Sequence, residues 1–168
     1  MTSTHRYFYN NDHLVNVLRP GNNQHCFQWR QLPLAEHSYT SDARTTQLLQ
    51  TDSSDSVSSV HLPHAVRNIN YTVYGYAKQH VNSPQIKGFN GYSLDAFTNL
   101  YHLGQGRRSL STALLRFTSP DRLSPFSKGG INSYCYCHGD PVNFRDPNGT
   151  SRIRNLLKYF GTKEHRKK

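Results

Sequence analysis

Acidic and apolar side chains are scarce in this chain of 168 residues. Only 10 residues are Asp or Glu, against 20 Lys or Arg, and the formal net charge is +10. The hydrophobic fraction is 35% and the mean hydropathy is −0.77. No stretch approaches the roughly 18 consecutive apolar residues of a transmembrane helix, so we expect none. The first residues also lack the apolar segment of a secretory signal peptide, which favours synthesis as a cytoplasmic protein.

Cysteines and the sequence motifs of known enzymes are equally sparse. The three cysteines, Cys26, Cys135 and Cys137, are an odd number, and we expect no disulfide framework. The Cys135-x-Cys137-His138 run is too tight for a structural zinc site, which places about two to four residues between its cysteines. We therefore interpret both cysteines as small, half-buried strand residues. The chain has no phosphate-binding loop, dinucleotide fingerprint, serine-hydrolase elbow or His-Glu-x-x-His motif. We predict no metal, no cofactor and no small-molecule substrate.

Aromatic residues are abundant, with 11 Tyr and 8 Phe. Because aromatic and β-branched residues favour strands, the sequence predicts a mainly β fold of short antiparallel hairpins. Residues 5–19 predict the first hairpin, with Asn10-Asn11-Asp12 at its tip, since Asn and Asp tolerate left-handed turns. Further strands are predicted at residues 25–30, 69–75 and 132–137, and an edge segment is predicted at residues 32–36.

The most distinctive stretch of the chain lies between residues 116 and 149. It contains, in this order, Arg116-Phe117-Thr118-Ser119-Pro120-Asp121, Gly129-Gly130-Ile131-Asn132, Gly139-Asp140-Pro141-Val142-Asn143 and Asp146-Pro147-Asn148-Gly149. Proline beside aspartate fixes φ and favours turns. The spaced series resembles the RHS repeat-associated core domain. That domain occurs in the C components of bacterial insecticidal toxin complexes and in polymorphic toxins.

The resemblance extends more weakly toward the N-terminus. Residues 5–19 resemble a degenerate tyrosine–aspartate (YD) repeat with Asn10 in place of the aspartate. Asp55 and Asn99 stand where the family has glycine, and we expect both to keep a left-handed turn. The family's aromatic pair near residue 108 is replaced by Arg108-Ser109-Leu110. We divide the chain into degenerate repeat hairpins (residues 1–84), the core domain (85–150) and a basic tail (151–168).

The resemblance also implies an incomplete architecture. In the family, such hairpins line a much larger shell, which 168 residues cannot enclose. We therefore expect an open sheet or a spiral fragment with exposed edges that is prone to association. The implied partners are a larger repeat or toxin-complex protein and an immunity protein, and the implied route out of the cytoplasm is export with a toxin complex.

A self-cleavage reaction is the chemistry that the resemblance implies. In the family, acidic residues cut the chain just after the Asp-Pro-x-Gly turn, which here ends at Gly149. The matching candidates are Asp121, Asp140 and Asp146, with Arg116 or Arg145 as a charge partner. Such a mechanism needs two carboxylates close enough to share a proton. In the alternative interpretation each aspartate only forms a turn. In an open fragment we expect the carboxylates to lie in water and the chain to stay uncut.

The last 18 residues carry seven basic side chains and one acidic side chain. Ile153, Leu156, Leu157 and Phe160 predict one face of a short helix that begins after Ser151 and ends at Gly161. Its basic residues are candidates for binding an anionic membrane or nucleic acid: Arg152, Arg154, Lys158, Arg166, Lys167 and Lys168. Alternatively, the tail is merely solvated, or it is the remnant of a truncated toxin.

Three functions follow from these observations and stay open here. The chain is a toxin-associated scaffold without catalysis, a small effector that acts through its tail, or a self-cleaving core that releases the tail.

Overall fold

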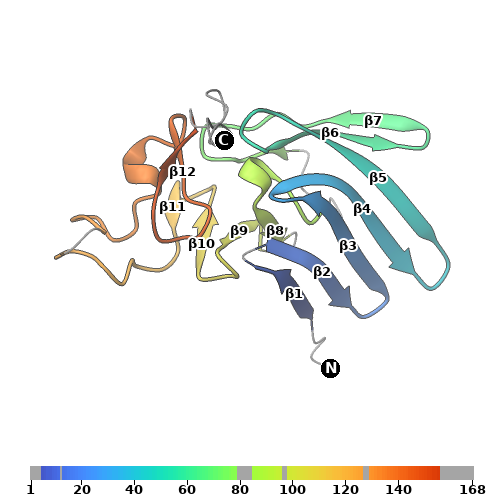
Figure 1. Ribbon diagram of the computed structural model, residues 1–168, viewed down its shortest axis with the longest axis horizontal. Helices are drawn as coiled ribbons and strands as arrows, with labels where there is room; N and C mark the ends of the chain where they lie inside the picture. The colour runs from blue at the N-terminus through green and yellow to red at the C-terminus, as the bar shows by residue number, and fades with distance from the viewer. Residues whose placement is uncertain (1–4, 12, 79–84, 96–97, 127–128, 156–168) are drawn as a thin grey trace, which may run out of the picture.

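The computed structural model describes residues 5–11, 13–78, 85–95, 98–126 and 129–155. Strands dominate this part of the chain and form three sheets, of seven, four and two strands. Figure 1 shows the seven-stranded sheet as a curved layer on one side of the molecule, with the smaller sheets and the long loops on the other. The prediction of a mainly β fold is confirmed.

The seven-stranded sheet is a run of successive antiparallel hairpins without a crossover. Its strands are β1 (Arg6–Asn10), β2 (His13–Arg19), β3 (Asn22–Trp29), β4 (Leu32–Thr40), β5 (Arg44–Thr51), β6 (Val57–Leu62) and β7 (Ala65–Asn68). The predicted first hairpin is present, and Asn11 has the expected positive φ of 53°. Asp55, in the turn between β5 and β6, has a φ of 67°, which confirms the left-handed turn predicted there.

The prediction of an edge segment at residues 32–36 is wrong, because β4 pairs with both β3 and β5. Pro33 is accommodated near the end of the hairpin, where it pairs with Gln28 beside a register shift in β3. The pairing of β4 with β5 begins only at Ala35, so no ladder bond to β5 is lost at Pro33.

Residues 85–95 cover one face of the large sheet. Ile86 packs with Leu14, Val17 and Cys26 in a small buried cluster. The buried carboxylate of Glu36 on β4 accepts hydrogen bonds from the backbone N–H groups of Ile86 (3.1 Å) and Lys87 (2.9 Å). Gln47 on β5 donates a third hydrogen bond, at 2.8 Å. Glu36 therefore fastens the second half of the chain to the sheet, and its burial raises the pKa of the carboxyl.

The four-stranded sheet has the order β11-β10-β9-β8. These strands are β8 (Ser93–Asp95), β9 (Leu100–Leu103), β10 (Arg108–Ser111) and β11 (Arg116–Phe117). A short 3-10 turn, η2 (Phe89–Gly91), precedes β8, and η3 (Cys137–Gly139) follows the long loop after β11. Asn99, before β9, has a φ of 57°, as predicted.

Aromatic side chains from several loops and strands form the largest buried cluster. It contains Phe89, Tyr92, Leu94, Tyr101, Leu103, Leu110, Phe117, Tyr136 and Cys137. The strands predicted at residues 69–75 and 132–137 are wrong, since both segments are turns and irregular backbone. Their alternating aromatics serve packing instead. Tyr71 donates a hydrogen bond to the carbonyl of Val57 at 2.9 Å, and Tyr136 is 0% exposed.

The third sheet joins β12 (Phe144–Arg145) to β13 (Ile153–Arg154). The helix predicted for the tail is wrong at Ile153 and Arg154, which form this strand. Cross-strand pairing with Phe144 and Arg145 satisfies backbone groups that an isolated short helix would leave to weak local bonds. The remainder of the predicted helix lies outside the described residues.

Candidate functional site

A cavity of about 410 Å³ lies between β10, the loop after β11 and the turn that follows β12. Its lining includes Arg108, Asp121, Asp146, Thr150 and Ser151. The cavity is large enough for several ordered waters. Two of the three aspartates predicted from the sequence therefore face one cavity, beside the peptide bond at which cleavage was expected.

Arg108 is the residue that joins these groups. It begins β10, in register with Leu103, and its side chain is 7% exposed. The guanidinium carbon lies 3.8 Å from the centroid of the Phe117 ring, a cation–π contact between β10 and β11. This stacking holds the planar group in place and leaves its N–H donors free to point toward the cavity.

Two carboxylates bind the same guanidinium. Arg108 Nη1 lies 3.2 Å from Asp121 Oδ2, and Arg108 Nη2 lies 3.1 Å from Asp146 Oδ2. The side chains of Asp121 and Asp146 are only 10% and 4% exposed. The expectation that these carboxylates lie in water is wrong. The fork geometry of arginine brings them side by side, but with a cation between them in place of a shared proton.

Asp146 also organises the turn that follows it. Its Oδ1 accepts hydrogen bonds from the backbone N–H groups of Thr150 (3.0 Å) and Ser151 (3.0 Å). Its own N–H donates to Tyr92 Oη at 3.0 Å, which fixes the residue to the aromatic core. Burial raises the pKa of Asp146, although the Ser151 hydrogen bond and the charge of Arg108 oppose that shift.

The peptide bond between Gly149 and Thr150 is held at both ends. Arg108 Nε donates a hydrogen bond to the Gly149 carbonyl oxygen. The Thr150 N–H donates to Asp146 Oδ1, and it also reaches Asn148 Oδ1 at 3.1 Å. A cation therefore faces the carbonyl oxygen and a carboxylate faces the amide nitrogen.

The close packing of the β9–β10 turn supports this arrangement. Gly104 has a φ of 56°, and a Cβ there would lie 2.0 Å from the Asn148 carbonyl oxygen. Only glycine permits this approach, since no real Cβ tolerates such a contact.

Asp121 is held by the loop after β11. Its Oδ1 accepts a hydrogen bond from the Leu123 N–H at 2.9 Å, and its N–H donates to the Ser133 carbonyl at 2.8 Å. This aspartate therefore does form a turn, as the alternative interpretation predicted, and it also presents Oδ2 to Arg108.

The other predicted catalytic residues lie elsewhere. Asp140 accepts hydrogen bonds from the backbone and side chain of Asn143, at 3.2 and 3.0 Å, and forms a turn. Arg145 pairs with Asp55 at 2.8 Å, which ties β12 to the turn between β5 and β6. Arg116 lies over the Tyr134 ring at 5.4 Å. Neither predicted arginine is therefore the charge partner of Asp121 or Asp146.

Cysteine chemistry does not explain the cavity, although Cys135, Cys137 and His138 contribute to its lining. Burial raises the pKa of Cys137 to about 12, so this thiol stays protonated at neutral pH. Among the described residues, no group of three or more His, Cys, Asp or Glu side chains is placed to hold a metal ion.

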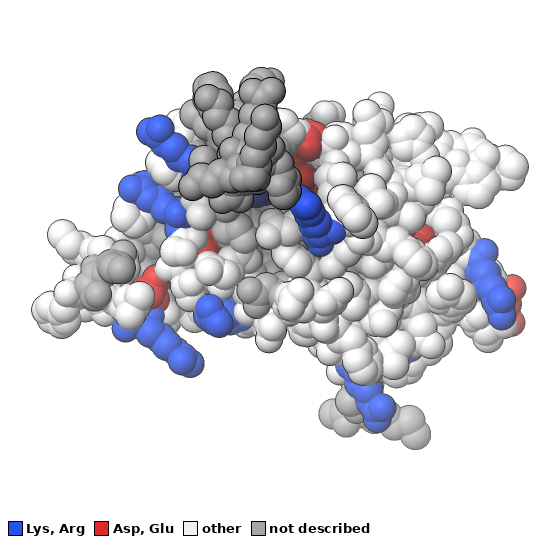
Figure 2. Space-filling view, viewed as in Figure 1, with Lys and Arg blue, Asp and Glu red and all other residues white. Residues whose placement is uncertain are grey.

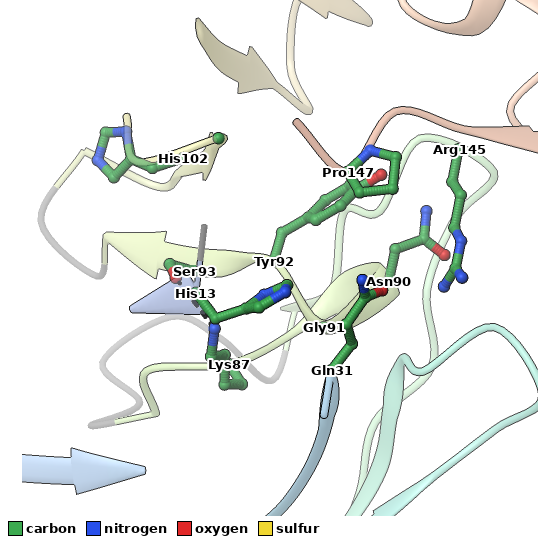
Figure 3. Close-up of a pocket in the computed structure, with 11 residues that line it drawn as sticks. His13, Gln31, Lys87, Asn90, Gly91, Tyr92, Ser93, His102, Arg145 and Pro147 are labelled. Atoms are coloured by element: carbon green, nitrogen blue, oxygen red, sulfur yellow. Dashed lines mark hydrogen bonds between the residues drawn. The ribbon is translucent and has the colours of Figure 1, made fainter. Parts of the chain in front are cut away.

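A second cavity of about 20 Å³ lies beside Tyr92 and Lys87 (Figure 3). The buried Lys87 Nζ donates to Ser93 Oγ at 3.3 Å, and burial lowers the pKa of this lysine. His13, Arg145 and Pro147 complete part of the wall. The space holds about one water molecule. It is a packing gap where residues 87–93 meet β2 and the Asp146-Pro147 turn.

The described part of the basic tail packs against Phe144. The guanidinium carbons of Arg152 and Arg154 lie 4.4 and 5.8 Å from the centroid of its ring. The other predicted binding residues, Lys158, Arg166, Lys167 and Lys168, lie outside the described residues. On the face shown in Figure 2, most of the blue basic side chains lie over the half of the molecule that contains the smaller sheets. None of the helices in the described ranges has the length and apolarity to cross a membrane.

Comparisons with protein-family models and with curated proteins find no match to this chain. The functional interpretation of the site therefore depends on its geometry and on the sequence resemblance. Sequence reasoning named Asp121, Asp146 and the Gly149–Thr150 bond, and it missed Arg108. The sequence did contain a signal for Arg108, because residues two apart in a strand point to the same face and Leu110, which is 0% exposed, points inward. An arginine on the apolar face of a strand needs buried anionic partners.

Proposed function

We propose that this protein is a self-processing core of the RHS type that hydrolyses its own Gly149–Thr150 peptide bond and releases the basic tail. One observation carries the proposal: Arg108 and Asp146 hold opposite ends of that single peptide bond. Asp121 reaches the same guanidinium from the other side. The sequence resemblance implies cleavage at the same bond.

Each group has a role in the reaction. Attack on the Gly149 carbonyl carbon puts negative charge on its oxygen, where the Arg108 Nε–H stabilises it as an oxyanion-hole donor. The leaving nitrogen of Thr150 must gain a proton, and Asp146 Oδ1 lies 3.0 Å from it. The raised pKa of Asp146 makes it a better proton carrier near neutral pH. Asp121 lines the 410 Å³ cavity and can take a proton from a water there.

Intact-mass measurement of the purified chain tests the proposal directly. The wild-type protein should yield two fragments, one that ends at Gly149 and one that begins at Thr150. Arg108→Met, Asp146→Asn and Asp121→Asn should each slow cleavage by roughly 10²-fold or more, because each removes a charge-stabilising or proton-transferring group. Asp140→Asn and Arg116→Met are matched controls outside the site and should cleave at the wild-type rate. A wild-type chain that remains one full-length species would overturn the proposal.

We also propose that a larger repeat protein extends the seven-stranded sheet at its edges. In the described ranges, β1 and β7 each pair with one neighbouring strand only. Unpaired edge groups are templates for further strands. Co-expression with a protein built of many such hairpins should give a complex, and Tyr7→Pro, which removes an N–H from β1, should weaken it. Co-purification that is unaffected by Tyr7→Pro would place the contact elsewhere.

A further inference from the structure

We infer that the side-chain hydroxyl of Thr150 is the nucleophile that opens the Gly149–Thr150 bond. The chain would first undergo an acyl shift from the nitrogen to the hydroxyl oxygen of Thr150, and water would hydrolyse the resulting ester second. This inference rests on the proposed function and names the attacking group, which that proposal leaves unspecified.

The position of Thr150 is the first argument. Thr150 lines the 410 Å³ cavity. Together with Arg108, Asp121 and Gly149, it also lines an adjoining cavity of about 340 Å³. Its backbone N–H is fixed by two acceptors, Asp146 Oδ1 and Asn148 Oδ1. The hydroxyl oxygen is bonded to Cβ of this same residue, so its attack on the carbonyl carbon of the preceding Gly149 is intramolecular. An intramolecular nucleophile has a very high effective concentration.

The occupancy of the two carboxylates is the second argument. Asp121 Oδ1 accepts a hydrogen bond from the Leu123 N–H, and Asp121 Oδ2 forms an ion pair with Arg108 Nη1. Both oxygens of Asp146 are engaged as well, by Thr150 N–H and by Arg108 Nη2. Direct attack of water on the amide would need strong activation by these paired carboxylates. An ester is more electrophilic than an amide, so Asp121 has to activate water only for the easier second step. The Thr150 hydroxyl needs no binding site of its own.

The first step balances without any external reagent. Thr150 Oγ1 forms a bond to the Gly149 carbonyl carbon, and its proton passes to Asp146 Oδ1. The carbonyl electrons move to oxygen, where Arg108 Nε–H holds the charge. The C–N bond then breaks as the electrons return, and Asp146 delivers the same proton to the Thr150 nitrogen. The products are an ester at Gly149 and a free amine, with Asp146 unchanged.

The second step consumes one water molecule. Asp121 takes a proton from a water in the cavity, and the hydroxide adds to the ester carbon. The C–O bond to Thr150 breaks, and Asp121 returns the proton to Oγ1. The core then ends in the carboxylic acid of Gly149, which passes its proton to water or to the Thr150 amine and becomes a carboxylate. The tail begins with Thr150 and its amine.

Substitutions at Thr150 test the inference. Thr150→Val removes the hydroxyl at nearly constant shape and should slow cleavage at least 100-fold, while Thr150→Ser should restore it. Thr46→Val, on an exposed position of β5, is a control for the same chemical change and should cleave normally. Thr150→Cys should cleave through a thioester, and added hydroxylamine should convert both the wild-type ester and this thioester to a hydroxamate at Gly149, read by mass.

The outcomes separate this inference from the function on which it rests. If Thr150→Val cleaves at the wild-type rate and no hydroxamate forms, water attacks directly, so this inference fails and the self-cleavage proposal stands. If Thr150→Val stays intact and Thr150→Ser cleaves, the hydroxyl is the nucleophile. If neither the wild-type chain nor any variant cleaves, both fall together.

Discussion

The two halves of this molecule are built on different principles. The half formed by β1–β7 is held by a regular ladder of backbone hydrogen bonds, and much of its outer face is in solvent. There Phe27 is 48% exposed and Leu48 is 59% exposed. In the half after residue 85, strands are short, yet the two largest fully buried side chains of the described chain, Tyr101 and Tyr136, lie there. The first half is the more regular one, and the second half contains the largest buried cluster and the candidate site.

The difference in packing between the two halves explains the position of the candidate site. Arg108, Asp121 and Asp146 come from three separate segments, and only a closely packed set of loops holds such segments together. Charges at that depth require full pairing, which the fork of Arg108 supplies. The large sheet contributes by anchoring the loops through Glu36 and through the Asp55–Arg145 pair.

The largest expected effect on stability is the difference between two Phe→Ala substitutions, one in each half. Phe117→Ala should lower the free energy of unfolding by about 3–5 kcal/mol, because Phe117 is 1% exposed and contacts Tyr136 and Arg108. Phe27→Ala should cost about 1 kcal/mol or less, since half of that ring already meets water. Urea unfolding followed by circular dichroism measures both. Equal losses would contradict the proposed difference between the halves.

Breaking the link between the halves should have the next largest effect. Glu36→Ala leaves the N–H groups of Ile86 and Lys87 without their acceptor and removes the buried carboxyl group beside the Lys87 side chain. We expect a loss of about 3 kcal/mol in urea unfolding. Asp42→Ala, in the exposed β4–β5 turn, is the matched control and should change stability by less than about 0.5 kcal/mol. If the two variants are equally stable, Glu36 does not join the halves.

Alanine substitutions of two glycines should have an intermediate effect on stability, and one of them also tests the candidate site. Gly104 and Gly21 both have positive φ, of 56° and 77°, but only Gly104 faces backbone atoms within reach of a Cβ. Gly21→Ala should therefore cost about 1 kcal/mol from the left-handed backbone alone. Gly104→Ala should cost about 2 kcal/mol and slow cleavage, because it displaces Asn148. Thermal unfolding and intact mass report the two effects. Normal cleavage in Gly104→Ala would show that the turn tolerates displacement.

The sequence predicted the ladder half better than the packed half, for a physical reason. A hairpin is specified by nearby residues, so alternation and turn chemistry predicted the first hairpin and the turn at Asp55, although no strands were predicted for β5, β6 and β7. Alternating aromatics at residues 69–75 and 132–137 show the same period, but their side chains pack into a core formed by distant segments. Tertiary packing overrides strand preference at such positions.

The site was predictable in part for the same reason. Asp121 and Asp146 were named because each matches a motif of the resembled family, and Asp140 was named on identical grounds although it only forms a turn. Local pattern cannot separate these three. What separates them is the position of Arg108, which depends on stacking against Phe117 from the neighbouring strand.

The smallest expected effect is a pH dependence that belongs to the large sheet. Burial lowers the pKa of His25, and the nearby His37 lowers it further. Below pH 6.5 the unfolded chain therefore binds a proton at His25 before the folded chain does. The unfolded state then binds more protons, so the stability that His25 contributes is present above its unfolded pKa and falls as the pH drops toward its folded pKa.

His25→Gln should remove this part of the pH dependence without affecting the packed half. Urea midpoints measured at several pH values between about 5 and 7.5 should fall less steeply for the variant than for wild type. His64→Gln, in the exposed turn between β6 and β7, is the control and should follow the wild-type curve. The cleavage rate of His25→Gln should match wild type at every pH, because the proposed catalytic carboxylates belong to the other half. A midpoint curve for His25→Gln that is superimposable on wild type would assign the pH dependence to other groups. A changed cleavage profile would show that the two halves are coupled more tightly than their separate construction indicates.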